Sequence, residues 1–270
     1  MKILRSFIAA FSTYSRIPVP HVSLENDDMK YCLAFFPLIG VVIGALELLW
    51  SRGASALGIP AEGWMFLACF IPVAVTGGIH LDGFIDSMDA VHSFGGIEKR
   101  HEILKDPHVG AFGVIKLAEY LIFCVFCLWM IGRAGSRGMI YVYCLGFVLA
   151  RSLSGISMTY FPPSKKTGML ASLRAHQSGR AAGRALIIWA AAAAALMILA
   201  EPVCGLASVG ASFICFSWYR HASVRDFGGV SGDTSGCFLC MTELAQVLAL
   251  AVCAAVPMIV SAAGAAGLSG

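Results

Sequence analysis

Charged residues are scarce in this chain. Only 13% of its 270 residues are Asp, Glu, Lys or Arg, against about 25% in an average soluble protein. Hydrophobic residues make up 58% of the sequence, and the mean hydropathy is +0.79. A soluble globular protein is excluded by so low a charge content, and the composition predicts a protein that crosses a membrane several times.

Signals for nucleic acid and for a cysteine-based metal site are also lacking. The formal net charge is only +3, and the sequence has no basic patch interleaved with aromatic residues. Most of the ten cysteines lie in apolar runs, where cysteine behaves as a small hydrophobic residue. Cys237 and Cys240 form a CxxC without a second pair or nearby histidines, which argues against zinc or redox chemistry.

Apolar runs of bilayer length, which is about 20 residues, recur along the chain. They fall near 32–50, 62–79, 112–132, 138–158, 185–200, 202–219 and 237–261. Before them, apolar residues at helical spacing favour a short helix lying on the membrane surface. We therefore expect an all-α fold, a polytopic integral membrane helix bundle of about seven transmembrane helices with an N-terminal interfacial helix. It would form a single membrane-embedded catalytic domain over residues 1–270. An eighth span would require a different division of the last run or of the N-terminal helix.

Basic residues are unevenly distributed between the connecting segments. They gather in the N-terminal segment and in the loops at 80–110, 159–184 and 220–236, and the alternate loops carry few. The positive-inside rule predicts that these four segments face the cytosol. We therefore expect a multi-pass protein of the cytoplasmic (inner) membrane, with its N-terminus inside and its polar clusters on the cytosolic side.

Three aspartates follow the second apolar run. Asp82, Asp86 and Asp89 are spaced by four and three residues, so a helix would stack them on one face. Carboxylates this close repel one another unless a cation lies between them, and Mg²⁺ takes carboxylate oxygens. A solvated acidic helix end is the alternative. We favour a metal site, because ionisable groups beside a membrane-length apolar run are costly and usually functional.

Further polar residues on the same predicted side are candidates for this site. Asp106 would either join the metal shell or cap a helix. Asp233 would either bind the metal or, like Thr234, cap the last helix. Gly232 lies in a glycine-rich loop that would accommodate a phosphate. His80 is a candidate metal ligand or phosphate contact, and a structural histidine is the alternative.

Basic side chains are candidates for contact with an anionic substrate. Lys165 and Lys166 would meet a polyphosphate, or would serve only as membrane anchors. Arg151 lies inside a predicted span, where a guanidinium needs an acidic partner. Glu119, Glu243 or an anionic substrate would serve, and a purely structural ion pair is the alternative.

Taken in order, these segments resemble the cobalamin synthase family, the adenosylcobinamide-GDP ribazoletransferases. The specific motifs are HLDGxxDxxD, KD…GxFG and GGVxGDTxG. The matching stretches are Arg16–Pro20, Phe36–Gly40, His80–Asp89, Lys105–Asp106 with Gly110 and Phe112–Gly113, Ala150–Arg151, Gly229–Gly236 and Glu243. Ala90 departs from the glycine common at that position. Cys240 stands where an acid is frequent, which leaves Glu243 as the candidate carboxylate there.

The resemblance implies a Mg²⁺-dependent phosphotransferase. In that reaction the ribose hydroxyl of α-ribazole, or of its 5′-phosphate, attacks the cobinamide-linked phosphorus of adenosylcobinamide-GDP, and GMP leaves. Phosphoryl transfer requires that charge on the phosphate oxygens be neutralised. We therefore expect Asp82 and Asp86 to bind the metal, Asp89 to act as ligand or general base, and Lys105 and Arg151 to contact phosphate.

Two other functions compete with this one. A CDP-alcohol phosphotransferase would carry DxxDGxxAR…GxxxDxxxD, which Asp82, Gly83 and Asp86 match only in part. A membrane transporter of divalent cations or corrinoids is the second, and the nearly uncharged external loops argue against it. The expected partners are the corrinoid-GDP and α-ribazole substrates and the lipid bilayer. A homo-oligomer and contacts with upstream pathway enzymes are compatible with the sequence.

Overall fold

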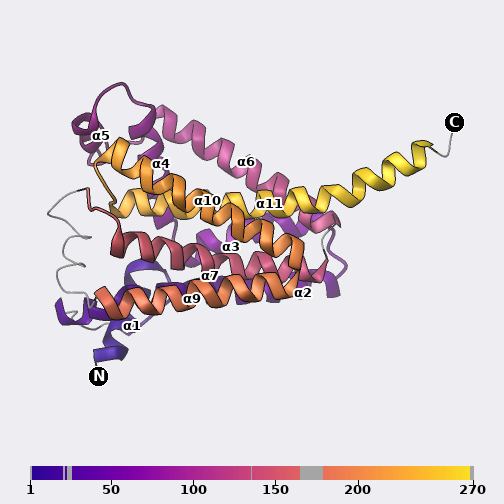
Figure 1. Cartoon of the computed structure of the whole chain (residues 1–270), viewed down its shortest axis with the longest axis horizontal. Helices are drawn as coiled ribbons and strands as arrows, with labels where there is room; N and C mark the ends of the chain where they lie inside the picture. The colour runs from indigo at the N-terminus through magenta and orange to yellow at the C-terminus, as the bar shows by residue number, and fades with distance from the viewer. Residues whose placement is uncertain (1, 21, 23–25, 135, 165–178, 268–270) are drawn as a thin grey trace.

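The computed structural model of the chain is a bundle of long helices (Figure 1). It describes residues 2–20, 22, 26–134, 136–164 and 179–267. Within these ranges every regular element is helical, and the one β-type contact is an isolated bridge between Pro163 and Val230. The expected all-α class is confirmed.

Long helices make up the body of the bundle. They are α2 (Cys32–Ala56), α3 (Ala61–Thr76), α6 (Ala111–Ala134), α7 (Arg137–Tyr160), α9 (Gly179–Ala200), α10 (Pro202–Phe227) and α11 (Gly232–Gly267). Shorter elements are α1 (Lys2–Tyr14), the 3-10 helix η1 (Asn26–Tyr31), α4 (Ile79–His92) and α5 (Ile97–Ile103). In the described part of the chain, 6 helices are long and apolar enough to cross a membrane, or 7 if α3 and α4 count as one broken span. The chain is therefore a multi-pass membrane protein.

The second expected apolar run, 62–79, is not one continuous helix. α3 ends at Thr76, and α4 leaves it at an angle of 94°. Gly77 and Gly78 form this elbow with φ values of 66° and 80°, a left-handed backbone region that glycine adopts without steric cost. Hydropathy continues through the elbow and does not reveal it, because the turn depends on backbone angles.

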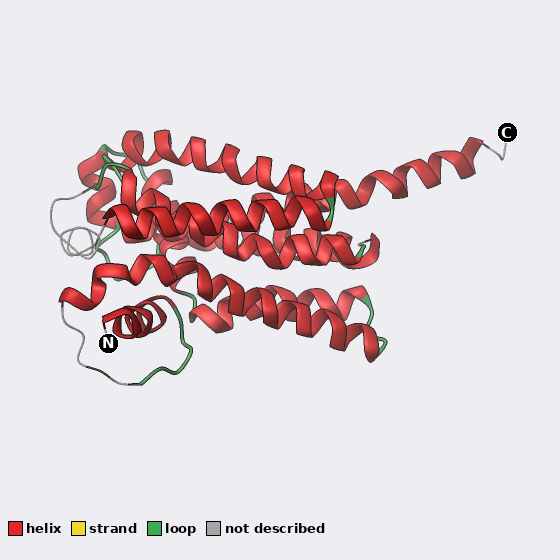
Figure 2. Cartoon of the chain, turned by 60° about the horizontal axis from the view of Figure 1, so that its bottom comes forward, coloured by secondary structure: helices red, strands yellow, loops and turns green. Residues whose placement is uncertain are grey.

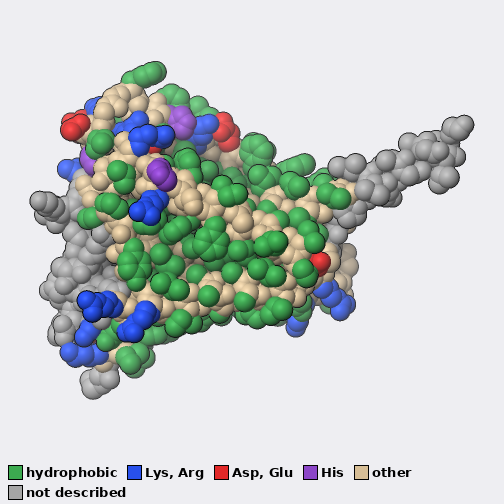
Figure 3. Space-filling model, in the orientation of Figure 1, with side chains coloured by type: hydrophobic (Ala, Val, Ile, Leu, Met, Phe, Trp, Pro, Cys, Tyr) green, Lys and Arg blue, Asp and Glu red, His purple; other side chains and the backbone are tan. Residues whose placement is uncertain are grey.

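The short elements gather at one end of the bundle. Figure 1 shows α4, α5 and the α10–α11 connection there, and the α2–α3 and α9–α10 connections at the opposite end. In Figure 2 the N-terminal helix is seen almost end-on, so α1 runs across the long helices. Charged side chains and histidines gather at the ends, and hydrophobic side chains cover the middle (Figure 3). The described parts of the segments predicted to share one side of the membrane thus share one end, called here the α4 end.

Close helix contacts fix the centre of the bundle. α7 packs against α2, α9, α10 and α11. Gly40 and Gly44 bring α2 against the α7 backbone, because a Cβ at either position would lie 2.5 Å from the carbonyl oxygen of Phe147 or Cys144. Small residues four positions apart are a common device for close approach of membrane helices. This packing encloses the polar side chains that α7 carries.

Candidate active site at the α4 end of the bundle

The two motifs richest in glycine and aspartate meet at the α4 end. α4 packs on α11 and α6. A Cβ at Gly83 of α4 would lie 2.7 Å from the carbonyl oxygen of Asp233 in α11. A Cβ at Gly236 of α11 would lie 3.3 Å from backbone atoms of His80. One glycine in each motif therefore permits the close approach that places Asp233 beside the aspartates of α4.

Asp86 lies at the centre of a group of carboxylates. It is half-buried, and it interacts electrostatically with Asp82, Asp233 and Asp89. Within the described part of the chain, the carboxylates of Asp82 and Asp86 have no hydrogen-bond or ion-pair partner. Asp82 and Asp86 therefore carry negative charge that the described part of the protein does not neutralise.

These carboxylates do not form a ready-made metal site. Among the residues that the structure describes, no three His, Cys, Asp or Glu side chains come close enough together to hold an ion. Like charges repel in the absence of a cation, so separated carboxylates are expected here. The ligand atoms that they offer are all oxygens, which Mg²⁺ prefers. The donor set thus fits the metal, and binding would draw the side chains together.

Asp89 has a different environment from its two neighbours on α4. It is buried, its Oδ2 accepts a hydrogen bond from the amide of Gly110 at 2.7 Å, and its Oδ1 accepts one from the amide of Gly113 at 2.9 Å. The first amides of a helix have no acceptor within that helix. Asp89 therefore holds the start of α6 against α4. The amides of Gly110 and Gly113, which belong to the KD…GxFG motif, therefore already have an acceptor within the protein.

Gly113→Ala is expected to destabilise the protein. The added Cβ would lie 2.6 Å from Oδ2 of Asp89 and 2.9 Å from the carbonyl oxygen of Ile85. Such overpacking typically costs about 1–3 kcal/mol. Chemical unfolding in detergent measures the loss. Gly210→Ala is the control, because no atom lies within 4 Å of a Cβ there. Equal stability of the two variants would contradict the Asp89–α6 contact.

Asp106 lies apart from the carboxylate group. Its Oδ1 accepts a hydrogen bond from the amide of His108 at 3.0 Å and lies 2.7 Å from Nδ1 of that ring. These contacts with the amide and then the ring of His108 hold the pKa of Asp106 below its usual range. Its further electrostatic partner is Lys99, whereas Asp86 interacts with Asp82, Asp233 and Asp89. The structure thus gives Asp106 a turn-forming contact and does not bring it to the other aspartates.

The start of α11 uses its hydroxyl groups for its own cap. The amide of Thr234 donates to Ser231 Oγ at 3.2 Å, and the amide of Ser231 donates to Thr234 Oγ1 at 2.9 Å. This reciprocal pair is a capping box. Thr234 is buried, and its hydroxyl lies 3.0 Å from that of Tyr219, while Gly232 is exposed. Ser231 therefore caps the helix, where the sequence suggested Asp233 or Thr234, and the Thr234 hydroxyl already has protein partners.

Three lysines are predicted to contact phosphate, and the structure shows no contact that tests this for the described one. Lys105 is exposed on the connection between α5 and α6. Lys165 and Lys166 lie outside the described residues. Their predicted contact with phosphate stays a prediction.

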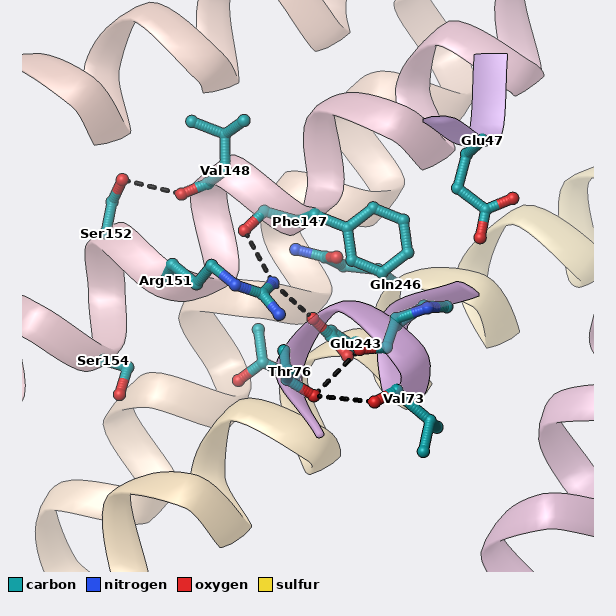
Figure 4. Close-up of polar contacts among 12 residues, drawn as sticks. Glu47, Val73, Thr76, Phe147, Val148, Arg151, Ser152, Ser154, Glu243 and Gln246 are labelled. Carbon is teal, nitrogen blue, oxygen red and sulfur yellow. Dashed lines mark hydrogen bonds and ion pairs between the residues drawn. The ribbon is translucent and has the colours of Figure 1, made fainter. Parts of the chain in front are cut away.

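Arg151 is fully buried in α7 and has an acidic partner. Its Nη1 donates to Oε1 of Glu243 at 2.7 Å and to the carbonyl oxygen of Phe147 at 3.1 Å. Figure 4 shows the guanidinium directed at Glu243, with Thr76 nearby. Of the partners that the sequence suggested, Glu243 is confirmed. Glu119 instead pairs with Lys116 at 2.8 Å.

Buried hydrogen-bonding groups remain unpaired around this ion pair. Nε and Nη2 of Arg151 and Nε2 of His80 have no partner among the described residues. An unmade bond to a buried polar group costs about 1–3 kcal/mol. All three groups line a cavity inside the bundle, and Thr76 and Leu81 line both this cavity and a second one beside Asp82. The cavity that contains the buried guanidinium thus adjoins the cavity beside Asp82.

Glu47 was missed by the sequence analysis. It is buried in α2, and its Oε1 accepts a hydrogen bond from the hydroxyl of Tyr143 at 3.1 Å. Its Oε2 has no partner among the described residues. A lone carboxylate within the apolar run 32–50 is the signal that would have found it, by the same cost argument that singled out Arg151.

Long-range contacts also stabilise the α4 end. Arg100 Nη1 of α5 pairs with Asp226 Oδ1 of α10 at 2.8 Å. The amide of Val230 donates to the carbonyl oxygen of Pro162 at 2.8 Å, which ties the end of α7 to the α10–α11 connection. The sequence offered no pairing signal for either contact. Both contacts fix the connecting segments around the group of aspartates.

Comparison with known proteins identifies the relatives of this chain. Residues 6–251 match the family model described as cobalamin-5-phosphate synthase. The chain is 34% identical over 252 residues to the adenosylcobinamide-GDP ribazoletransferase of Lachnoclostridium phytofermentans, which covers 93% of this chain and 95% of that protein. It is 32% identical over 250 residues to the enzyme of that name from Pseudomonas entomophila, with 91% and 98% covered. No solved structure matches significantly.

Proposed function

The chain belongs to the cobalamin-5-phosphate synthase family, and from this we propose that it joins adenosylcobinamide-GDP to α-ribazole, or to its 5′-phosphate, with release of GMP. The supporting observation is the meeting of α4 with the start of α11, which brings Asp233 beside Asp82 and Asp86. A new bond forms between the ribose oxygen and the cobinamide-linked phosphorus. The bond from that phosphorus to the bridging oxygen breaks, and the hydroxyl proton is released.

We propose that Mg²⁺ binds to Asp82, Asp86 and Asp233. The environment of Asp82 and Asp86 supports this, because neither carboxylate has a cationic partner among the described residues. Bound Mg²⁺ would neutralise negative charge on the phosphate oxygens of the substrate. Asp89 is expected to position α6 instead of taking the hydroxyl proton, because both of its oxygens already accept amide hydrogen bonds.

Behind the carboxylates, the buried cavity is suited to hold uncharged acceptor groups of a substrate. Arg151 offers Nε–H and Nη2–H, and His80 offers Nε2, without protein partners among the described residues. The charge of Arg151 is already matched by Glu243 at 2.7 Å. We therefore expect Arg151 and His80 to orient a substrate by hydrogen bonds, and Glu243 to keep the guanidinium in place.

We propose that the α4 end faces the cytosol in the cytoplasmic membrane. The described parts of the basic N-terminal segment and of the basic loops lie at this end, which the positive-inside rule assigns to the cytosol. Both substrates would then reach the site from the cytosol.

A reconstituted reaction tests the proposed function. The detergent-purified protein is incubated with adenosylcobinamide-GDP, α-ribazole and Mg²⁺, and corrinoid product and GMP are quantified. We expect the two products in equal amounts. The absence of corrinoid product, or corrinoid uptake by reconstituted vesicles without GMP release, would refute the proposal.

Metal removal is expected to stop the reaction. With EDTA, the rate of GMP release should fall by about 10²-fold or more, because the charge on the diphosphate would no longer be neutralised. Added Mg²⁺ in excess should restore the rate. The unfolding temperature of the protein without substrate, measured with and without EDTA, controls for loss of structure. Full activity in EDTA would exclude a metal at these carboxylates.

A further inference from the structure

A second cavity opens beside Asp82 at the α4 end. It has a volume of about 590 Å³ and lies between the end of α1 and the elbow that joins α3 to α4. Sites for small-molecule ligands are typically about 300–1,000 Å³. Its lining includes Thr13 and Arg16 from the α1 side, Gly77 and Gly78 from the elbow, and Asp82 from α4. We call it the elbow cleft.

The elbow itself holds Arg16 in position. The amide of Arg16 donates to the carbonyl oxygen of Val75 at 2.8 Å. The Arg16 side chain lies against Gly77, where a Cβ would collide with its Cγ and would come within 2.6 Å of its Nε. Gly77 therefore has two reasons to be glycine, its φ of 66° and the passage of this side chain.

Among the residues that the structure describes, none accepts a hydrogen bond from the guanidinium of Arg16. The side chain is exposed, and within the described part of the chain it has neither a hydrogen bond nor an ion pair. Asp82 lines the same cleft, and its carboxylate also has no hydrogen-bond or ion-pair partner among the described residues. A cation and an anion thus share one cleft without neutralising each other.

The start of α4 adds a second favourable element for an anion. α4 begins at Ile79, directly after the elbow, and Ile79 and Leu81 line the cleft. The first amides of a helix have no acceptor within it, and the positive end of the helix dipole lies there. The planar guanidinium matches the oxygens of a phosphate group. One side of the cleft therefore suits phosphate, and the carboxylate side suits a phosphate-bound cation.

We propose that the elbow cleft binds the nucleoside diphosphate portion of the substrate, with Arg16 on the phosphate that leaves with the nucleotide. This rests on the proposed function. When the bond to the cobinamide-linked phosphorus breaks, the bridging oxygen stays with GMP, whose phosphate gains one negative charge. Arg16 binds that phosphate and stabilises the added charge. The lining of the cleft includes the exposed polar side chains of Ser12, Arg16 and Asp82, whereas Arg151 and His80 in the other cavity are buried. The elbow cleft therefore suits a hydrophilic nucleotide.

Calorimetric titration of the full-length, detergent-purified protein with GDP and Mg²⁺ tests the proposal. Arg16→Gln keeps the length of the side chain and removes its charge, and Arg16→Lys keeps the charge without the forked donors. We expect the dissociation constant for GDP to rise about tenfold or more in Arg16→Gln and less in Arg16→Lys. Arg220→Gln is the control, because Arg220 is an exposed cation in α10 outside the cleft lining, where it lies over the ring of Phe161.

Kinetics supply a second readout. In the Arg16 variants the KM for adenosylcobinamide-GDP should rise, and the KM for α-ribazole should stay as in the unaltered protein. A GDP affinity within about threefold of the unaltered protein in a folded Arg16→Gln would overturn the proposal, as would a lack of GDP binding by the unaltered protein. If Arg16→Gln does not fold, the same criteria apply to Arg16→Met, which also removes the charge. Failure of the proposed function is a separate result, since the unaltered protein would then form no corrinoid product.

Discussion

Asp86→Asn is expected to lower turnover by about 10²-fold or more, the loss typical when a group that stabilises transition-state charge is removed. Asp86 is the carboxylate whose surroundings contain Asp82, Asp89 and Asp233 together. Asparagine keeps the size and one oxygen of the side chain but removes the negative charge that holds a cation. The other carboxylates would then bind Mg²⁺ more weakly, and charge on the diphosphate would be less well neutralised.

The measurement is the rate of GMP release at saturating substrates, followed over a range of Mg²⁺ concentrations. Asp86→Asn should require more Mg²⁺ for half-maximal activity, and Asp82→Asn should behave in the same direction. Glu98→Gln is the matched control, because Glu98 is an exposed acid on α5 at the same end. Near-normal turnover in Asp86→Asn or Asp82→Asn would remove that residue from the site.

Arg151→Met is expected to destabilise the protein by about 3–5 kcal/mol, the usual cost of removing one partner from a buried ion pair. The substitution leaves the carboxylate of Glu243 inside the bundle without its contact at 2.7 Å. Arg151 is 0% exposed, so water cannot replace the lost partner without rearrangement of α7. Chemical unfolding in detergent measures the loss of stability.

A double variant separates the structural role of this pair from its role in catalysis. Replacing both partners by apolar residues of similar size, as in Arg151→Met with Glu243→Leu, should recover most of the lost stability. Turnover should nevertheless stay low, because the donors offered by Nε and Nη2 of Arg151 are absent. Recovery of both stability and turnover would show that the pair serves only the fold. Unchanged stability in Arg151→Met would contradict the ion pair itself.

Some features depend only on a local residue pattern, or on the high free-energy cost of exposing apolar surface or burying a charge. These features followed directly from the sequence. A chain with 58% hydrophobic and 13% charged residues can bury its apolar surface only in a membrane. Aspartates spaced by four and three residues share one helix face in any helix. A guanidinium inside a span needs an acidic partner, which made Glu243 a candidate from sequence alone and a contact in the structure.

Other features depended on how segments distant in sequence approach one another. Asp89 has the same local pattern as Asp82 and Asp86, yet it meets the amides of Gly110 and Gly113 because α4 and α6 converge there. The elbow at Gly77 and Gly78 lies in a run whose hydropathy is uninterrupted, and only backbone angles create it.

The sequence by itself determined the membrane class, the helical register of the acidic residues and the chemistry available to them. Tertiary structure alone decided which carboxylates kept that chemistry and which became hydrogen-bond acceptors for the protein. It also placed Arg16, which follows α1, in the cleft that contains Asp82. The physical reason is that helix periodicity and hydration cost act over a few residues, whereas the partner of a buried polar group is set by the packing of whole helices.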